Sequence, residues 1–510
     1  MKLLSNNLIL DVQKRFKTMN EINNLHDGDD KEENVVRKAG RGIVWNLLTY
    51  GLGKGAVLVT TSILARMLTK DDFGLVSIAV IAINYLSIIK DLGLGVALIQ
   101  KREDIESAAN TVFLINFALG IFLSAVTYPM APWVATYFNE PMVTPVLRWL
   151  GVSFVINAMG SVHIVLLQRD MDYRRKFIPD FGNTVVKAFA SIGFAYAGFG
   201  VWSLVLGQLL GTAASSILVW IILPWRPVFS FDKEIAKNLM KFGSSIIGGD
   251  ILSFFIDNID YILVGKIFGV TELSIYTLAF RLPETILIGN LWVMGGVVFP
   301  AFSKLQNKPK EMKRGLLASI RIVQIIAVPI SLGLIVAADP IIRVAFGEQW
   351  LDSVPLLRVL AIYAWIYSLG YHVGDIYKAI GRPDILLKLS IFTLIVLVPS
   401  LLLGSLYGVI GVACGHILAV VIRRVVSLYV ATKYVNINIY EVFGELMPAI
   451  TGGFFMSVIV GVSLLVTKGL NPFIQLPILV IAGTISYIGV LYRIEKDNIL
   501  RLIRMIGIPL

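Results

Sequence analysis

The chain contains 510 residues, of which 56% are hydrophobic and only 15% are charged, and its formal net charge is +11. Soluble domains carry about 25% charged residues, so the composition indicates an integral membrane protein with room for about a dozen or more spans of about 20 residues. Basic residues gather in alternate loops, which is typical of membrane topology and makes nucleic acid an unexpected partner. The single cysteine, Cys414, excludes disulfides and cysteine-based metal sites, and we expect it to be a buried small side chain.

The first 38 residues are polar and charged and lack the pattern of a secretory signal peptide. We expect residues 1–38 to form a disordered cytosolic tail. An alternative is a short helix on the membrane surface or on a partner, because Leu8, Ile9, Val12 and Phe16 are apolar.

Apolar runs follow one another from Arg41 almost to the end of the chain, and no gap between them could hold a soluble domain. We predict an all-α, polytopic membrane protein with about 14 transmembrane helices. The predicted spans are 42–66, 73–99, 106–130, 145–167, 177–197, 200–223, 241–266, 273–302, 315–338, 353–377, 385–404, 407–432, 444–467 and 472–492.

Lysine and arginine are enriched in cytoplasmic loops of membrane proteins, so their distribution predicts orientation. If the N-terminus is inside, the inner segments hold nearly all the loop cations, including five between Lys304 and Arg314. The opposite loops hold few, such as Lys266 and Arg343. We therefore predict that both termini are cytoplasmic.

One stretch, residues 254–284, combines two apolar runs with charges on either side of a polar turn at 269–274. Asp257 lies 12 residues before the turn and Arg281 lies 7 residues after it. At 1.5 Å per residue the average is roughly 14 Å, about half of a 30 Å hydrocarbon layer. Charges at that depth usually face a partner or a water-filled cavity. The stretch is predicted to be a helical hairpin that contributes to a functional site.

The same hairpin pattern occurs earlier in the chain. Residues 68–79 match residues 268–279 at an offset of 200, and two weaker echoes follow at similar offsets. Internal repeats are typical of transporters, whose substrate site lies between the repeats near the membrane midplane. We predict two homologous six-helix lobes. The predicted division is a tail at 1–38, an N-lobe at 39–224, a C-lobe at 225–434, and two further helices with a cytosolic C-terminus at 435–510.

The hairpin carries the motif D-x-x-D-x-x-x-x-G-x-x-x-G followed by Y-x-x-A-x-R. Its residues are Asp257, Asp260, Gly265, Gly269, Tyr276, Ala279 and Arg281. The motif, together with the run from Ala65 to Gln100, resembles the bacterial polysaccharide flippases, most of all the colanic acid or teichuronic acid exporter type (Wzx-like). These belong to the multidrug/oligosaccharidyl-lipid/polysaccharide (MOP) exporter superfamily. The resemblance covers about residues 38–495, although Ser274 stands where glycine is common.

This resemblance implies a bacterial inner-membrane transporter with two lobes in a V. Such a protein would flip an undecaprenyl-pyrophosphate-linked oligosaccharide from the cytoplasmic to the outer leaflet by alternating access. The product would serve exopolysaccharide, capsule, O-antigen or teichuronic-type polymer biosynthesis. Expected partners are the lipid-linked oligosaccharide, a possible H⁺ or Na⁺ counter-ion, and the polysaccharide polymerase and export machinery.

A pyrophosphate crossing a membrane needs cations, and four of those inside predicted spans are candidates. We expect Lys54, Lys187 and Arg281 to line a central cavity, where low dielectric strengthens charge-assisted hydrogen bonds. Lys90 is a weaker candidate, because it stands next to Asp91 and could pair with it. Arg281 could equally be paired internally, with Asp257 or Asp260.

Tyr363, Tyr367 and Tyr371 recur every four residues on one helical face, which could contact sugars or pack internally. A second group consists of carboxylates within the spans, which could couple transport to an ion or form ion pairs. Its members are Asp257, Asp260, Glu284 and Asp375.

No cofactor is expected, because the chain has no Walker A sequence, and His372 and His416 lie isolated in apolar runs without the spacing of a metal site. The alternative function is a cation-coupled multidrug exporter of the same superfamily. A polytopic glycosyltransferase or polymerase is a poorer fit, because the longest outer loops, at 130–144 and 339–352, are too short for an extracytoplasmic catalytic domain. We therefore expect a transporter and no enzyme.

Overall fold

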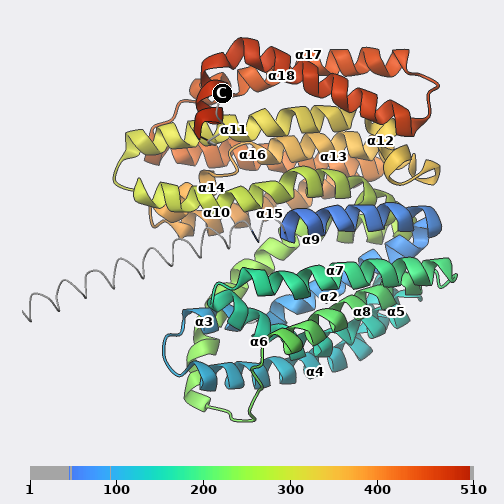
Figure 1. The fold of residues 1–510 in the computed structure, drawn as a ribbon, viewed down its shortest axis with the longest axis vertical. Coiled ribbons are helices and arrows are strands. Elements are labelled where there is room, and N and C mark those ends of the chain that lie inside the picture. The colour runs from blue at the N-terminus through green and yellow to red at the C-terminus, as the bar shows by residue number, and fades with distance from the viewer. Residues whose placement is uncertain (1–44, 46–48, 92, 506–510) are drawn as a thin grey trace, which may run out of the picture.

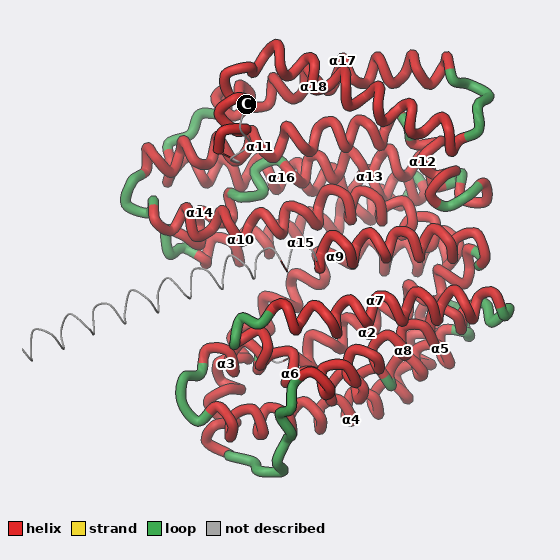
Figure 2. Tube along the Cα trace, viewed as in Figure 1, coloured by secondary structure: helices red, strands yellow, loops and turns green. Residues whose placement is uncertain are grey.

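The computed structural model describes residue 45 and residues 49–91 and 93–505 (Figure 1). The expectation of a disordered tail at 1–38 lies outside these residues. Throughout the described part the chain is helical and contains no strand (Figure 2). Helices satisfy every backbone hydrogen bond internally, which hydrocarbon requires, so the apolar runs of the sequence fold this way.

A helix at 49–67 and the helices α2 to α8 form one group, drawn blue to green in Figure 1. The bounds are α2 Lys70–Asp91, α3 Leu94–Gln100, α4 Ile105–Phe138, α5 Val143–Gly151, α6 Ser153–Arg169, α7 Tyr173–Tyr196 and α8 Val201–Ile222. We call this group the N-lobe.

The long helix α9 (Lys233–Pro283) leads into the second group. Asp232 precedes it, and the Asp232 carboxylate caps its first turn. The second group consists of η1 Glu284–Ile288, α10 Gly289–Lys304, α11 Pro309–Val336, α12 Ala338–Ala345, η2 Glu348–Trp350, α13 Ser353–Ser368, α14 Val373–Ala379, α15 Pro383–Ser405 and α16 Gly408–Val435. With α9 it forms the C-lobe. The chain ends in α17 (Ile439–Val466) and α18 (Pro472–Met505).

Within the described residues, 11 helical segments are long and apolar enough to cross a membrane. One of them, Gly248–Ile288, contains two arms that meet at Gly269, whose φ of 85° breaks the helix. The helices at 49–67 and at α7 fall on the first and fifth predicted spans. Helices thus cover the described part of every predicted span, and the all-α membrane fold is confirmed.

Several helices that were predicted to be continuous are broken in the structure. The tenth predicted span divides into α13 and α14 at Gly370, which has a φ of 62°. The fourth divides into α5 and α6. Conversely, α4 continues past Pro129 and Pro132, where the prediction ended it near 130. The expectation for Cys414 was wrong, since its side chain is exposed on α16.

The two predicted hairpins pack against each other through α2 and the second arm of α9. The Thr271 hydroxyl donates a hydrogen bond to the Asp71 carboxylate, and these positions are equivalent under the offset of 200. A side chain at Gly74 would overlap the backbone carbonyl of Val270, so the helices touch closely there. Equivalent positions of two related units meet in this way when a two-fold rotation relates the units. We therefore infer that a two-fold rotation relates the two lobes.

The lobes also meet at a cluster that we call the Trp350 seam. Trp350 is completely buried, donates its indole N–H to the Ala65 carbonyl at 2.7 Å, and packs edge-on against Phe73 with ring centres 5.5 Å apart. Nearby, Lys70 and Asp352 form an ion pair at 2.6 Å. The seam closes one end of the molecule, the end predicted to face outward.

The helices α17 and α18 lie at the edge of the C-lobe (Figure 1). Arg321 on α11 holds both, through Glu445 at 3.3 Å and through Glu495. Tyr487 donates a further hydrogen bond to the Ile325 carbonyl at 2.8 Å. The pair therefore packs on α11 rather than entering the interface between the lobes.

Candidate functional site

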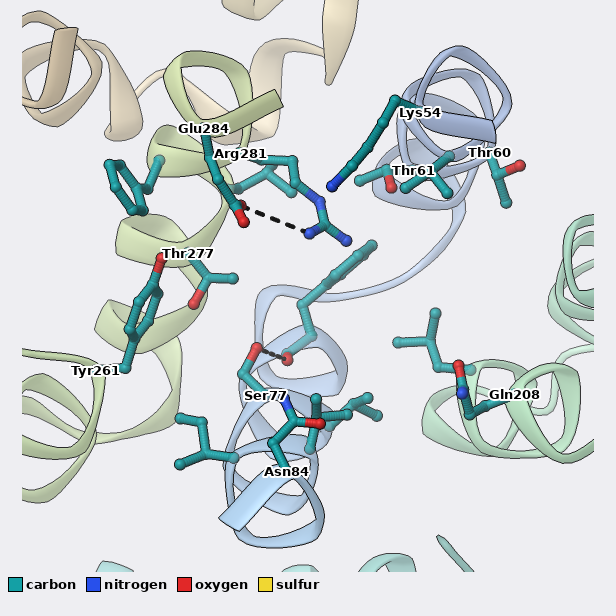
Figure 3. Close-up of a pocket in the computed structure, with 18 of the residues that line it drawn as sticks. Lys54, Thr60, Thr61, Ser77, Asn84, Gln208, Tyr261, Thr277, Arg281 and Glu284 are labelled. Carbon is teal, nitrogen blue, oxygen red and sulfur yellow. Dashed lines mark hydrogen bonds and ion pairs between the residues drawn. The ribbon is translucent and has the colours of Figure 1, made fainter. Parts of the chain in front are cut away.

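A cavity of about 840 Å³ lies between the lobes. The first helix, α2, α7 and α8 line it from the N-lobe, and α9, α13 and α16 line it from the C-lobe. Figure 3 labels lining residues of the first helix, α2, α8, α9 and η1. Its volume is in the usual range for a pocket that encloses a small-molecule ligand, about 300–1,000 Å³. It therefore has room for a ligand of small-molecule size.

Three predicted cations line this cavity from three helices: Lys54, Lys187 and Arg281. Figure 3 shows the Lys54 side chain extending toward the Arg281 guanidinium. Lys187 lies close enough to Arg281 for their like charges to repel. Within the described residues neither lysine has a carboxylate at ion-pair distance; the Lys187 ammonium donates to the Gln208 side-chain oxygen, and Lys54 lies 5.6 Å from the Tyr50 ring. Two of the three cations therefore lie in the cavity without a carboxylate partner among the described residues.

Close packing of α7 against α8 places Lys187 beside Gln208. Gly207 and Gly211, one turn apart on α8, lie so near α7 that a side chain on either would overlap Ser191 or the Lys187 side chain. Small residues four apart allow helix backbones in a membrane to approach closely. The glycines of α8 therefore determine the position of one of the three cations.

Arg281 is paired differently from the expectation. Its guanidinium lies 3.8 Å from the Glu284 carboxylate, one turn along the same helix, and both side chains are partly exposed to the cavity (38% and 41%). Asp257 also lines the cavity, but the basic groups that act on it most strongly are Arg423 and His416 on α16. The proposed pairing of Arg281 with Asp257 or Asp260 is thus replaced by a long contact with Glu284.

Asp260 lies behind the cavity wall and is completely buried. It accepts a hydrogen bond from the Tyr276 hydroxyl at 2.7 Å and lies 3.3 Å from Nδ1 of His416. His416 lines the cavity, and its ring centre is 4.2 Å from that of Tyr363. A carboxylate and an imidazole are therefore in contact at the boundary between the cavity and the C-lobe core.

Three other predicted site residues lie outside the cavity lining. The buried Lys90 ammonium donates to the Asn157 side-chain oxygen at 2.6 Å, while the side chain of Asp91, its expected partner, lies outside the described residues. Asp375 is buried between His372 at 3.0 Å and Lys378 at 3.3 Å. Tyr371 packs against the Tyr367 ring, with ring centres 5.8 Å apart. Internal packing and pairing account for all three.

Tyr363 and Tyr367 do line the cavity, on the C-lobe side. Arg424 fixes the second of them, since its guanidinium lies 4.8 Å from the Tyr367 ring and donates to the Tyr367 carbonyl. That carbonyl is near the end of α13, where the helix breaks and its own hydrogen bonds stop. Arg424 therefore stabilises the break beside the cavity.

The sequence analysis missed three charged or titratable groups of this region: Arg423, Arg424 and His416. The two adjacent arginines inside an apolar span were a usable signal, because cations at that depth usually face protein or a cavity. His416 offered none, since its partner Asp260 is far away in the sequence. In the described part of the chain no group of three or more His, Cys, Asp or Glu side chains could hold a metal ion.

Comparison with known proteins agrees with this architecture. The family described as "Polysaccharide biosynthesis protein" matches residues 63–355, more than half of the chain. The chain belongs to this family. It is 26% identical over 476 residues to the teichuronic acid biosynthesis protein TuaB of Bacillus subtilis, covering 92% of this chain and 98% of that one. It is also 25% identical over 400 residues to the lipopolysaccharide biosynthesis protein WzxC of Escherichia coli, covering 77% and 80%. The resemblance noted from the sequence is confirmed.

Solved structures show the same fold at lower sequence identity. The lipid II flippase MurJ, in an inward closed conformation, aligns with a TM-score of 0.71 at 15% identity over 90% of this chain and all of MurJ. An inward-facing multidrug resistance transporter of the MATE family, in the MOP superfamily, aligns with a TM-score of 0.62 at 17% identity over 76% and 94%. This member of the polysaccharide biosynthesis family therefore has the MurJ and MATE architecture.

Proposed function

We propose that the protein flips an undecaprenyl-pyrophosphate-linked oligosaccharide from the cytoplasmic to the outer leaflet by alternating access. The observation that carries the proposal is the meeting of Lys54, Lys187 and Arg281 in one cavity between the lobes. A cation at mid-membrane costs at least about 2.5 kcal/mol when nothing compensates it. An anionic cargo supplies that compensation, and water supplies it when the cavity is empty.

The substrate pyrophosphate would bind where these cations converge. Glu284, at 3.8 Å from Arg281, holds a weak ion pair there that an incoming phosphate can replace. Tyr363 and Tyr367 would offer the sugars an aromatic surface from the C-lobe. Lys90 and Tyr371 are not part of this proposed site, because they do not line the cavity.

A counter-ion would bind on the C-lobe side. We assign this role to Asp257, Asp260 and His416, since His416 contacts a buried carboxylate on one side and the cavity on the other. Glu284 would couple ion and cargo through Arg281. Sodium binding by the same carboxylates is the alternative, whereas Asp375 is satisfied by internal pairs.

A multidrug exporter remains the second candidate function, because MATE transporters share the fold. The polysaccharide assignment is favoured because Lys54 and Lys187 have no carboxylate partner among the described residues, so they would repel cationic compounds even though Asp257 and Glu284 also line the cavity. The relatives include a succinoglycan biosynthesis transport protein, ExoT of Rhizobium meliloti, which supports a transporter rather than an enzyme. Polymerase and export machinery are the proposed downstream partners.

Transport can be measured with purified protein in vesicles that contain undecaprenyl pyrophosphate bearing a fluorescent oligosaccharide. We expect the protein to expose this lipid to a membrane-impermeant reagent, and an imposed proton gradient to change the rate. Dependence on a sodium gradient alone would select the alternative ion. If the protein leaves the lipid in place but exports cationic dyes, the flippase proposal is wrong.

Both termini are proposed to be cytoplasmic in this multi-pass membrane protein. Exposed Lys308 and Met142 lie in predicted inner and outer loops, and Met142 has an ordinary backbone conformation that cysteine can adopt. In a Cys414→Ser background, an impermeant maleimide should label Met142→Cys in intact cells and Lys308→Cys only after permeabilisation. Replacing Cys414 is necessary because it is exposed. The reverse labelling pattern would invert the topology.

A further inference from the structure

Three neutral amides line the N-lobe side of the cavity: Asn84 on α2, Asn183 on α7 and Gln208 on α8. We call them the amide wall. Figure 3 shows Asn84 and Gln208 on the side of the cavity away from Glu284. Apart from Lys54 and Lys187, the polar N-lobe residues of the lining are uncharged. One side of the cavity therefore offers hydrogen bonds without adding charge.

The hydrogen bonds of the amide wall are largely unused. In the described part of the protein the side chains of Asn84 and Asn183 have no hydrogen-bond partner, and Gln208 uses only its oxygen, for Lys187. The neighbouring hydroxyls differ, because Ser77 donates to the Phe73 carbonyl of its own helix at 2.8 Å. Thr60 does the same to Ala56 at 2.7 Å. Other hydroxyls of this side, those of Tyr50 and Ser191, also have no hydrogen-bond partner among the described residues, and the amides add further unpaired donors to them.

An amide has two N–H donors and an oxygen that accepts two hydrogen bonds. Unpaired groups of this kind are costly at membrane depth, so they need water or a polar solute in the cavity. Sugar hydroxyls both donate and accept, and neighbouring hydroxyls on a ring can contact the two ends of one amide. A phosphate, by contrast, only accepts hydrogen bonds, and cationic side chains bind it more strongly.

We propose that the amide wall binds the sugar attached directly to the pyrophosphate and discriminates among sugars there. The inference rests on the proposed flippase function and deepens it. The contact between Lys187 and Gln208 joins the wall to the cations, so a pyrophosphate on the cations places its first sugar against the amides. Tyr363 and Tyr367 face that sugar from the C-lobe. A site built to hydrogen-bond hydroxyls selects strongly, because a mismatched sugar leaves its groups unpaired.

The proposed role of the amide wall can be tested by measuring how tightly two kinds of probe bind to purified protein in nanodiscs. One is undecaprenyl pyrophosphate, and the other is the same lipid carrying a single glucose, galactose or N-acetylglucosamine, whichever binds most tightly. Asn84→Leu should lower the affinity for the sugar-bearing probe about tenfold and change the affinity for the sugar-free probe by no more than about twofold. Asn84→Gln should recover part of the loss. Ser87→Ala is the matched control, because Ser87 lies on the same helix outside the cavity lining and donates to the Ile83 carbonyl at 2.9 Å. It should change neither affinity by more than about twofold.

The outcomes separate this inference from the flippase proposal. If the parent protein binds neither probe, the proposed function fails. If the parent binds both and Lys54→Ala weakens both, while Asn84→Leu affects the two probes equally or not at all, the cation site stands and the amide wall is wrong. Retained binding of the sugar-free probe by Asn84→Leu shows that the variant is folded.

Discussion

Replacing both Lys54 and Arg281 with alanine should weaken the binding of undecaprenyl pyrophosphate by about 100- to 10,000-fold. Each substitution removes a charge-assisted hydrogen bond worth roughly 1.5–3 kcal/mol, which is about tenfold to a hundredfold in affinity. The losses combine to less than their full product if both cations contact the same phosphate. Arg281→Lys should retain part of the affinity, because an ammonium cannot make the paired contact of a guanidinium.

The measurement is the Kd of each variant in nanodiscs, together with polymer export in cells that lack their own flippase. A double variant, Lys308→Ala with Lys388→Ala, removes the same net charge from exposed positions and should bind normally. Normal binding and export by the Lys54 and Arg281 variants at normal abundance would refute the cation site. The observed ion pair adds a second criterion: Glu284→Gln should soften the effect of Arg281→Gln, whereas Asp257→Asn should not.

Trp350→Ala should shift the protein toward the state in which the Trp350 seam is open. Truncating a fully buried tryptophan costs about 3–5 kcal/mol, and here much of that contact is made across the lobes, with Ala65 and Phe73. The substitution therefore destabilises mainly the state in which the seam is closed. If the free energies of the two states change relative to each other by that amount, the equilibrium constant between them changes by more than a hundredfold.

In a Cys414→Ser background, a cysteine in place of Ser62, whose hydroxyl donates to the Ala345 carbonyl inside the seam, reports this shift. Its reaction with an impermeant maleimide from outside should accelerate strongly in the Trp350→Ala background. Trp133→Ala removes an equally large side chain that is 79% exposed, and it should leave the reaction unchanged. An unchanged rate in Trp350→Ala, with protein abundance lowered, would assign Trp350 to stability alone.

Features that depend on neighbouring residues of the sequence were predicted well. Apolar runs of sufficient length must form helices in hydrocarbon, so the spans could be placed within a few residues. Lys54, Lys187 and Arg281 could be assigned a similar depth by counting residues from the helix ends, and all three line one cavity. Depth is a property of each helix by itself and can be derived without knowing how the helices pack.

Rotation and pairing of the helices could not be derived in this way. Arg281 contacts Glu284 because Glu284 follows three residues later, in η1, whereas Asp257 lies on the other arm of α9. Cys414 and His416 are two residues apart on α16, yet one is exposed and the other lines the cavity. The amide wall was overlooked for a related reason, since single asparagines and glutamines in apolar spans give no pattern until three helices bring them together.

The helix α2 carries both the closing surface and part of the proposed cargo surface. Its first turns supply Lys70, Phe73 and Gly74 to the contacts between the lobes, while Asn84 lies farther along and faces the cavity. Substitutions in the later turns can therefore alter cargo preference without changing how the lobes close. An ancestral transporter of this kind could acquire a new polysaccharide through a few replacements in these turns while its transport cycle was inherited intact. Diversification of surface polymers in such a lineage would then be limited by the enzymes that build the sugars more than by the membrane step.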